Sequence, residues 1–261
     1  MLIAQITDLH CTAEGTRALG RFDTNAALEA AVAHVNRLRP DLVVVTGDIV
    51  NGPAPGEYAA AAPRLSRLEA PWLPIPGNHD DREGMRGAFG HLGLFPAGGE
   101  FLHYVHDAGP LRILALDTVV AGRIEGRLCG ERLSWIAARL AEAPERPTLV
   151  IMHHPPFACG IGFMDAIRCE GADALAAILR PYPIAGVLCG HNHRATAVGF
   201  AGTVAFGAPS TAFQMALDLR PEAPPRWTAE PPAIAVHLWE PGHGLRSHVS
   251  PVGVWEWRGF A

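Results

Sequence analysis

The sequence predicts an α/β fold in which helices cover a sheet of mainly parallel strands. The clearest observation is the apolar run at residues 42–45, which contains three consecutive valines and is typical of a strand buried on both faces. Runs of this kind alternate with segments whose apolar residues recur at helical spacing. The run at 42–45 also ends abruptly at Gly47-Asp48, and open α/β sheets bind ligands at the carboxyl ends of their strands. The pattern therefore predicts both the fold class and the edge at which a site lies.

The individual elements follow from local signals along the chain. Strands are expected at residues 2–7, 42–46, 72–75, 102–106, 111–116, 148–152, 185–189, 195–200 and 203–206. Helices are expected at residues 24–38, 57–68, 131–141 and 170–180. The first helix has Leu28, Val32 and Val35 at helical spacing and either Asp23 or Thr24 as its N-cap. The turn at 107–110 and Gly202 each join an antiparallel pair, and the chain beyond them is strand-rich with a proline-dense stretch at 221–232.

Composition excludes several classes of function. The net charge of −5 argues against a general nucleic-acid binder and against a protein that docks on anionic membranes. All 21 basic residues are arginine, so neither a lysine-containing phosphate loop nor Schiff-base catalysis is available. No apolar stretch approaches the ~20 residues of a membrane span, and no signal peptide is expected.

The cysteines indicate a reducing compartment. There are five of them, widely spaced and without a Cys-x-x-Cys pair, so the sequence favours neither a disulfide framework nor a zinc ribbon. We therefore expect a cytoplasmic protein.

Five of the expected strands end directly in residues that commonly bind metals. These residues are Asp8 and His10, Asp48, Asn78 and His79, His153, and His191 with His193. Carboxylate, imidazole and amide oxygen ligands suit hard to borderline divalent ions such as Zn, Fe, Mn or Co. These residues are more than one ion needs, but two ions that share a bridging carboxylate would need all of them. Two-metal sites of this kind catalyse phosphoryl hydrolysis.

Two neighbouring residues have open roles. His154 fits either a core histidine or a partner that orients His153. Asp80 fits either a turn acid or a group that orients a histidine ligand. The remaining histidines follow no strand-end pattern, which indicates surface or structural positions.

These motifs resemble the calcineurin-like binuclear metallophosphoesterases. The matching series is Asp8-x-His10, Gly47-Asp48-x-x-Asn51, Gly77-Asn78-His79-Asp80, His153 and Gly190-His191-x-His193, spanning residues 3 to about 195. Within that superfamily the chain is most similar to the bacterial glycerophosphodiesterase and class III cyclic-nucleotide phosphodiesterase branch, whose loops its segments 22–26, 153–156, 164–170 and 207–211 resemble.

The resemblance implies a four-layer αββα sandwich, and the strand-rich end of the chain is expected to extend it. We expect a catalytic domain over residues 1–215, followed by residues 216–261 as a lid or as oligomer contacts within the same domain or a subdomain.

The resemblance also implies how two divalent ions are held. The first ion would be bound by Asp8, His10, Asp48 and His193. The second would be bound by Asp48, Asn78, His153 and His191, so that Asp48 bridges the two ions. Asp48 and His79 are the expected catalytic residues, and Asn78, His79 and His193 are expected to contact the substrate.

Charge counting explains which substrate such a site attracts. Two divalent ions, two carboxylates and a hydroxide leave about one positive charge, which suits a phosphodiester monoanion. The metals would supply hydroxide near neutral pH for attack on phosphorus, and a protonated His79 would serve as general acid. Glycerophosphodiesters and 3′,5′-cyclic nucleotides both remain open as substrates, and so does the identity of the metals.

Two alternatives use the same fold. A phosphomonoesterase or phosphoprotein phosphatase would need extra positive charge for a dianion, for which Arg82 and Arg194 are candidates. The second alternative is a scaffold protein that keeps the fold but does not catalyse a reaction. Such proteins usually lose metal ligands, whereas here every ligand of the motifs is present.

The C-terminal end also predicts assembly. It carries Trp227, Trp239, Trp255, Trp257 and Phe260, an aromatic content typical of an interface or a packed lid. A homo-oligomer is expected.

Overall fold

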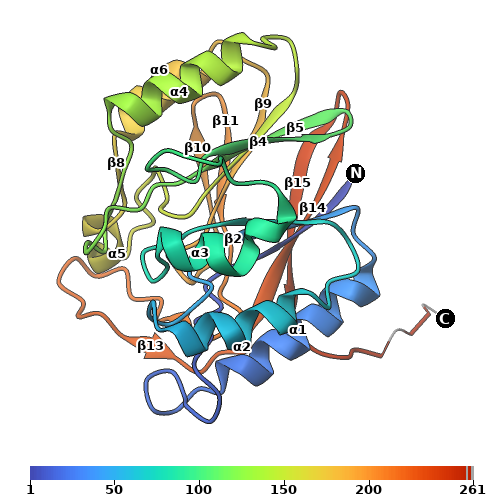
Figure 1. Cartoon of the computed structure of the whole chain (residues 1–261), viewed down its shortest axis with the longest axis vertical. Helices are drawn as coiled ribbons and strands as arrows, with labels where there is room; N and C mark the ends of the chain where they lie inside the picture. Colours follow the sequence, from blue (N-terminus) through green and yellow to red (C-terminus); the bar gives the residue numbers. More distant parts are fainter. Residues whose placement is uncertain (257, 260–261) are drawn as a thin grey trace.

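The computed structural model describes residues 1–256, 258 and 259. It contains two central β-sheets with helices on both outer sides (Figure 1). The α/β class predicted from the sequence is confirmed.

The first sheet brings together the two ends of the chain. Its order is β15-β14-β1-β2-β3. The strands are β1 (Leu2–Ile6), β2 (Leu42–Thr46), β3 (Trp72–Ile75), β14 (Ala233–Glu240) and β15 (Gly244–Pro251). The strands β1, β2 and β3 are parallel, whereas β14 lies antiparallel to β1 with Ala4 opposite Val236. Part of the predicted extension thus lies in the same sheet as the first strand.

The second sheet contains the middle of the chain. Its order is β10-β11-β9-β7-β5-β4. The strands are β4 (Tyr104–Ala108), β5 (Leu111–Leu116), β7 (Thr148–Met152), β9 (Ile184–Cys189), β10 (Thr196–Phe200) and β11 (Thr203–Gly207). The predicted antiparallel pairs β4–β5 and β10–β11 are both confirmed. Short two-stranded pairings add β6 (Gly126–Arg127) with β8 (Cys169–Glu170), and β12 (Gln214–Met215) with β13 (Trp227–Thr228).

Helices cover the outer faces of both sheets. They are α1 (Thr24–Leu38), α2 (Pro55–Leu65), α3 (Arg82–Phe89), α4 (Gly130–Ala141), α5 (Gly162–Ala166) and α6 (Ala172–Leu179), with a 3-10 turn η1 (Gly90–Leu92) after α3. The helices α1 to α3 lie on one side of the molecule, and α4 with α6 lie on the other (Figure 1).

The three consecutive valines of β2 show why the sequence forms these layers. Val43 and Val45 pack against the helices of the first sheet, with Leu28 of α1 among their neighbours. Val44 points the other way, into the layer between the sheets, where it packs with Ile151 of β7. A strand buried on both faces needs apolar residues at every position, because successive side chains point to opposite faces. The resulting order is helix, sheet, sheet, helix.

Helix prediction succeeded where capping signals were clear. The helix α1 has the predicted bounds, and Asp23 is its N-cap because its carboxylate accepts a hydrogen bond from the Ala26 N–H. Helix α2 begins at Pro55, two residues before the predicted start. Helix α3 was not predicted, since Gly84 and Gly87 lower the helix propensity of this segment. Its N-cap Asp81 accepts from the Gly84 N–H.

Within the part of the chain that the structure describes, no helix combines the length and the apolar character needed to cross a membrane.

Candidate metal centre

The predicted ligands converge at the carboxyl ends of five strands. Asp8 and His10 follow β1, Asp48 follows β2, and Asn78 follows β3. His153 follows β7, while His191 and His193 follow β9. The centre therefore lies where the two sheets present their strand ends to each other. All of these side chains are buried except that of Asn78, which is half-buried.

Five of the predicted ligands have a left-handed backbone. The φ angles are 51° for Asp8, 45° for His10, 50° for Asp48, 70° for His191 and 47° for His193. Side chains other than glycine rarely adopt this region, and each such residue costs free energy of order 1–3 kcal/mol. Strained residues of this kind gather where function requires a geometry that relaxed turns do not give. Sequence reasoning did not foresee this feature.

The loops that carry the ligands need glycine for close approach. A Cβ at Gly47, whose φ is +95°, would lie 2.5 Å from Nδ1 of His153. A Cβ at Gly77 would overlap the Asp48 carboxylate and its backbone nitrogen. Glycine at positions 47 and 77 therefore lets the Gly47-Asp48 and Gly77-Asn78-His79 loops pack closely against their neighbours, because any larger residue would collide with them.

One group of ligand atoms contains Asp8, His10, Asp48 and His193, whose candidate donor atoms all lie within 4.8 Å of one another. Nδ1 of His193 donates to the carbonyl oxygen of Phe213 at 2.7 Å, since a carbonyl can only accept. Nε2 of His193 is left facing Nε2 of His10 at 3.1 Å and Oδ1 of Asp8 at 3.3 Å. A histidine whose second nitrogen is fixed by a backbone carbonyl is the usual arrangement of a metal ligand.

A second group surrounds His153. Its Nδ1 donates to the Thr46 carbonyl oxygen at 2.8 Å. Its Nε2 lies 3.4 Å from Oδ2 of Asp48 and 3.2 Å from Oδ1 of Asn78. Nε2 of the neighbouring His191 is buried and has no hydrogen-bond partner among the described residues. Asp48 thus contacts both groups, as expected of a bridge.

The pKa values show that the carboxylates of both groups attract positive charge. Burial lowers the pKa of His10 to about 3, and it lowers the pKa of His191 to about 3 as well. Burial also lowers the pKa of His153, but the Asp48 carboxylate outweighs it and raises the value to about 9. The pKa of His193 is raised in the same way, by Asp8 against burial. His10 and His191 are thus held neutral, whereas Asp48 and Asp8 draw protons towards His153 and His193. Divalent cations bound between these groups would take the place of those protons.

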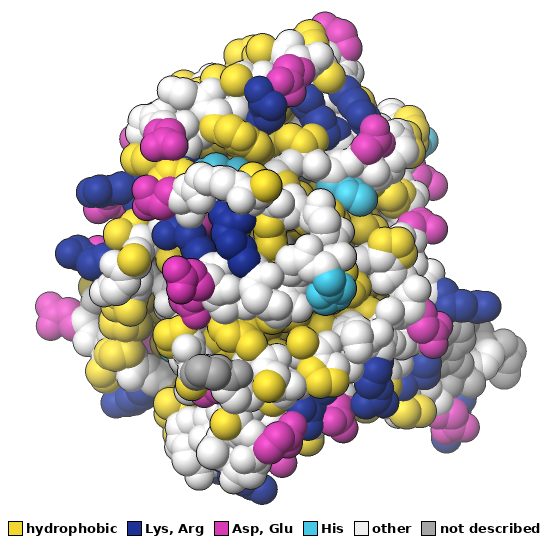
Figure 2. Space-filling view, in the orientation of Figure 1, with side chains coloured by type: hydrophobic (Ala, Val, Ile, Leu, Met, Phe, Trp, Pro, Cys, Tyr) yellow, Lys and Arg dark blue, Asp and Glu magenta, His cyan; other side chains and the backbone are white. Residues whose placement is uncertain are grey.

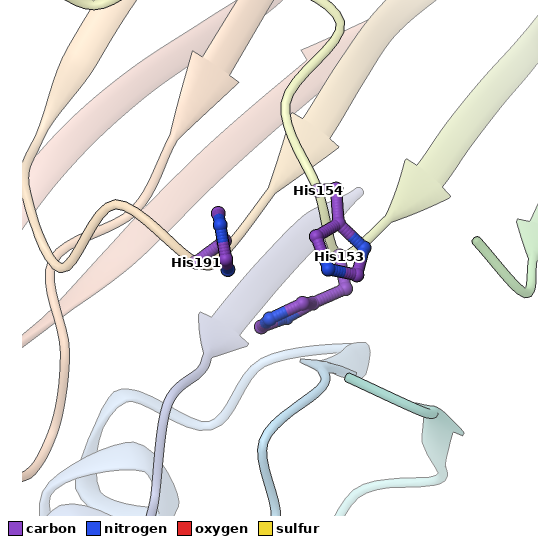
Figure 3. A group of neighbouring side chains, drawn as sticks. All are labelled: His153, His154 and His191. Atoms are coloured by element: carbon purple, nitrogen blue, oxygen red, sulfur yellow. The ribbon is translucent and has the colours of Figure 1, made fainter. Parts of the chain in front are cut away.

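His154 lies beside the second group but is already satisfied. Figure 3 shows it with His153 and His191. One ring nitrogen from each of the three imidazoles lies within 4.8 Å of the others, which is close enough to share a metal ion. However, Nδ1 of His154 pairs with the Thr118 hydroxyl at 2.8 Å, and Nε2 pairs with the Ile124 carbonyl oxygen at 3.2 Å. With both nitrogens engaged, it is a structural neighbour of His153 and lacks a free ligand atom.

Asp80 ties two ligand loops together. Its carboxylate accepts from the backbone N–H groups of Ile49, Val50 and Gly77 at 3.1, 3.2 and 2.9 Å. Burial, with the Asp48 charge adding to it, raises its pKa to about 7. Among the described residues, Asp80 makes no hydrogen bond to a histidine. It therefore orients the ligand loops and not a histidine ligand.

His79 faces the pocket beside the ligands. Its Nδ1 donates to the Asn51 carbonyl oxygen at 2.6 Å, and its backbone N–H donates to Oδ1 of Asp48 at 2.9 Å. Its ring lies edge-on to that of His10, with centroids 4.7 Å apart. These contacts leave Nε2 for the pocket.

Two supporting hydroxyls were missed by sequence reasoning. The Thr24 hydroxyl donates to the His10 carbonyl oxygen at 2.7 Å, and the Ser210 hydroxyl donates to the Asp8 carbonyl oxygen at 2.8 Å. Both hold predicted ligand residues that have a left-handed backbone. Their position within the loop motifs at 22–26 and 207–211 was the available signal.

A cavity of about 310 Å³ opens above the two groups. His10, Asp48, Asn78, His79, His191 and His193 form its floor, and its walls are largely apolar. The cationic candidates Arg82 and Arg194 are engaged elsewhere. Arg82 donates to Asp117 at 2.6 Å, and Arg194 makes two hydrogen bonds of 2.6 Å to Glu230.

Comparison with known proteins identifies the family of the chain. Residues 1–195 match the family model described as calcineurin-like phosphoesterase. A glycerophosphodiester phosphodiesterase, GpdQ of Enterobacter lignolyticus, is 36% identical over 244 residues, which cover 91% of this chain and 86% of the relative. The 3′,5′-cyclic adenosine monophosphate phosphodiesterase CpdA of Escherichia coli K12 is 34% identical over 217 residues, covering 81% and 76% respectively.

The fold has a counterpart among solved structures. A dimetal phosphatase from Danio rerio superimposes with a TM-score of 0.67 at 14% identity, over 97% of this chain and 99% of that one. At this identity the likeness concerns the fold. Together with the family match over residues 1–195, the observations establish that the chain belongs to the calcineurin-like phosphoesterase family.

Proposed function

We propose that this protein is a metal-dependent phosphodiesterase that hydrolyses small phosphodiesters. The observation that carries the proposal is a buried group of Asp8, His10, Asp48 and His193 in which Asp48 also contacts His153 of a neighbouring group, beneath a cavity. The relatives named as glycerophosphodiester and cyclic AMP phosphodiesterases support the same reaction class.

Two divalent ions fit the two groups. Asp8, His10, Asp48 and His193 would hold the first, and Asp48, Asn78, His153 and His191 would hold the second. Nitrogen and oxygen donors without thiolate suit Fe, Mn, Zn or Co. When bound, the ions supply positive charge for the phosphoryl oxygens and activate water for attack on phosphorus.

The chain's own residues then orient the substrate and move a proton. The hydrogen bond from Nδ1 of His79 to Asn51 fixes the imidazole, with Nε2 directed to the cavity. When protonated, His79 donates from Nε2 to the departing ester oxygen. Asn78 and His193, which line the same cavity floor, would contact the substrate beside the ions.

The relatives favour a diester over a monoester. Those named above are phosphodiesterases, and the two arginines considered for a dianion, Arg82 and Arg194, are bound to Asp117 and Glu230. Charged side chains of both signs are interspersed on the face shown in Figure 2. The monoesterase alternative therefore has less support.

A substrate panel tests the proposal. The purified protein, supplied with Mn²⁺, is assayed with glycerophosphoethanolamine, cyclic AMP, bis(4-nitrophenyl) phosphate and 4-nitrophenyl phosphate. At least one diester should be turned over faster than the monoester. A faster monoester, or no diester turnover, would contradict the proposal.

We also propose a cytoplasmic homo-oligomer. All five cysteines are free thiols, as a reducing compartment would keep them.

The aromatic residues near the C-terminus bear on the assembly. Trp239 packs between the sheets and Trp227 lines the cavity, which leaves Trp255, 60% exposed, for an interface. Trp257 and Phe260 lie outside the described residues. Light scattering at micromolar concentration should show more than one copy, and a monomer would refute the assembly.

A further inference from the structure

Exposed apolar side chains gather around the mouth of the cavity. Leu19, Ile124, Phe163 and Trp227 all line it, although they are 56%, 50%, 38% and 41% exposed. Large apolar side chains that remain exposed around a cavity mark a binding surface for an apolar or flat group. The metal centre accounts for the floor of the cavity but not for these walls.

The walls carry a single charged group outside the metal centre. Among the described residues that line the cavity, Arg226 is the one cation, and the one carboxylate is that of Asp48 at the floor. No described residue forms an ion pair with Arg226. Asp218, on the same segment, is hydrogen-bonded to Arg220 at 2.8 Å and feels Arg226 only at longer range. The Arg226 guanidinium thus remains available to a ligand.

Contacts to the metal centre hold this wall in place. The short pairing of β12 with β13 sets Met215 opposite Trp227, and the Arg226 carbonyl oxygen accepts from the Ala216 N–H at 2.8 Å. Trp227 meets Phe22 edge-on at 5.0 Å, Phe22 stacks on Phe213 at 5.1 Å, and Phe213 stacks on His10 at 5.3 Å. A series of aromatic rings therefore connects the metal centre with Arg226 and its neighbour Trp227.

The same wall is unsuited to a substituent that carries an ammonium group. The charge of Arg226 repels one, and the described residues of the cavity walls offer no carboxylate to bind it. Trp227 could attract a cation through its ring face, but the Arg21 guanidinium already lies 5.4 Å from the ring centroid. A nucleobase suits the wall better, because it stacks on apolar side chains and offers acceptors to a guanidinium.

We propose that Arg226 and the apolar wall around it select phosphodiesters whose ester substituent is flat and uncharged, such as a nucleoside, over those that bear an ammonium group. This inference rests on the proposed phosphodiesterase function. It identifies Arg226 as a specificity-determining residue, which donates to the substituent while the metal centre binds the phosphate. The cavity, at about 310 Å³, lies at the lower end of the ~300–1,000 Å³ typical of small-molecule sites and suits a mononucleoside.

The test compares two natural diesters in wild type and Arg226 variants. The ratio of kcat/KM for cyclic AMP to that for glycerophosphoethanolamine is measured with Mn²⁺ in each protein. Wild type should favour cyclic AMP. Arg226→Gln should lower this ratio about tenfold, as expected for the loss of one charge-assisted hydrogen bond. Arg226→Glu, which attracts the ammonium group, should lower it on the order of a hundredfold.

The controls separate failure of this inference from failure of the function. Arg246→Gln, on exposed β15 outside the cavity, should leave both rates unchanged. Bis(4-nitrophenyl) phosphate reports whether the centre cleaves diesters at all. If wild type hydrolyses no diester, the proposed function is wrong, and the inference that rests on it is wrong as well. If it hydrolyses them but prefers the ammonium substrate, or if both Arg226 variants keep the wild-type ratio, the inference alone is overturned.

Discussion

At the residue scale, the ligands combine predictable chemistry with a backbone that sequence does not reveal. Their side-chain types and their positions after apolar runs were sufficient to predict Asp8, Asp48 and the histidines as ligands, and the structure brings these side chains together. Their left-handed backbone was not foreseeable, because non-glycine residues adopt it only where surrounding contacts impose it. The role of Asp80 was also open, since its partners Ile49 and Val50 come from a different loop.

Asp48→Asn should remove both metal and activity. Asp48 is the carboxylate that contacts both groups, at 3.8 Å from Nε2 of His10 and 3.4 Å from Nε2 of His153. Asp80→Asn changes a carboxylate that only orients the loops and should cost at most the ~10–100-fold typical of such outer partners. Metal analysis and diester turnover of both variants check this. Two bound metals and near-normal turnover in Asp48→Asn would show that Asp48 is not the bridge.

Gly77→Ala should disrupt the centre by steric overlap alone. The added methyl would collide with the Asp48 carboxylate and backbone nitrogen, so metal content and turnover should fall together. Gly87→Ala in helix α3 is the matched control, because a methyl group added there meets no neighbouring side chain. It should stabilise the protein by roughly 0.5–1 kcal/mol. Normal metal content in Gly77→Ala would refute the close approach.

His79→Ala should affect substrates according to their leaving group. A general acid matters most for a poor alkoxide leaving group, so hydrolysis of glycerol-type diesters should fall ~10²–10⁴-fold, while nitrophenyl diesters are largely spared. Metal content should not change. His91→Ala removes an exposed histidine on η1 as a control. Equal losses on both leaving groups would make His79 a binder of the phosphoryl oxygen.

At the element scale, buried polar side chains connect strands that are distant in sequence. Gln5 of β1 donates to Thr46 of β2 and to the Cys189 carbonyl oxygen of β9, each at 2.9 Å, so it links the two sheets. His237 of β14 donates from Nε2 to the Gln5 side chain at 3.0 Å and accepts from the Ser247 hydroxyl of β15 at 2.7 Å. Such links were not predictable, because they depend on which strands become neighbours.

His237 should make stability depend on pH. Burial lowers its folded-state pKa to about 3, whereas an unfolded histidine titrates near ~6.5. Between these values the unfolded chain binds more protons, so the contribution is complete above pH ~6.5 and is lost as pH falls toward ~3, with a slope of up to ~1.4 kcal/mol per pH unit.

Urea unfolding of the chelator-treated protein between about pH 4 and 7, inside this window, measures the slope. His237→Gln should flatten it relative to wild type, and His243→Gln, which removes an exposed imidazole, serves as the control. Parallel pH dependences in wild type and His237→Gln would mean that His237 does not remain neutral in the folded protein.

At the scale of the whole molecule, the sequence predicted the layers better than the cavity walls. Strands β3 and β7 and helix α1 have the predicted bounds, because continuous apolar runs and a clear N-cap define them. The five residues of α5 and the segment 216–232, whose regular structure includes the two-residue strand β13, carry no periodic signal, yet they supply Phe163, Arg226 and Trp227. The division of the chain at residue 215 stays a prediction, although β14 and β15 complete the first sheet.

The most direct test of the central claim is a metal titration of the metal-free protein that follows both bound metal and the initial rate on bis(4-nitrophenyl) phosphate. A centre in which Asp48 serves two ions predicts two Mn²⁺ ions bound per chain, with hydrolysis reaching its maximum only when the second ion is bound. Full diester hydrolysis in the metal-free protein, or a rate that saturates with one ion per chain, would contradict it.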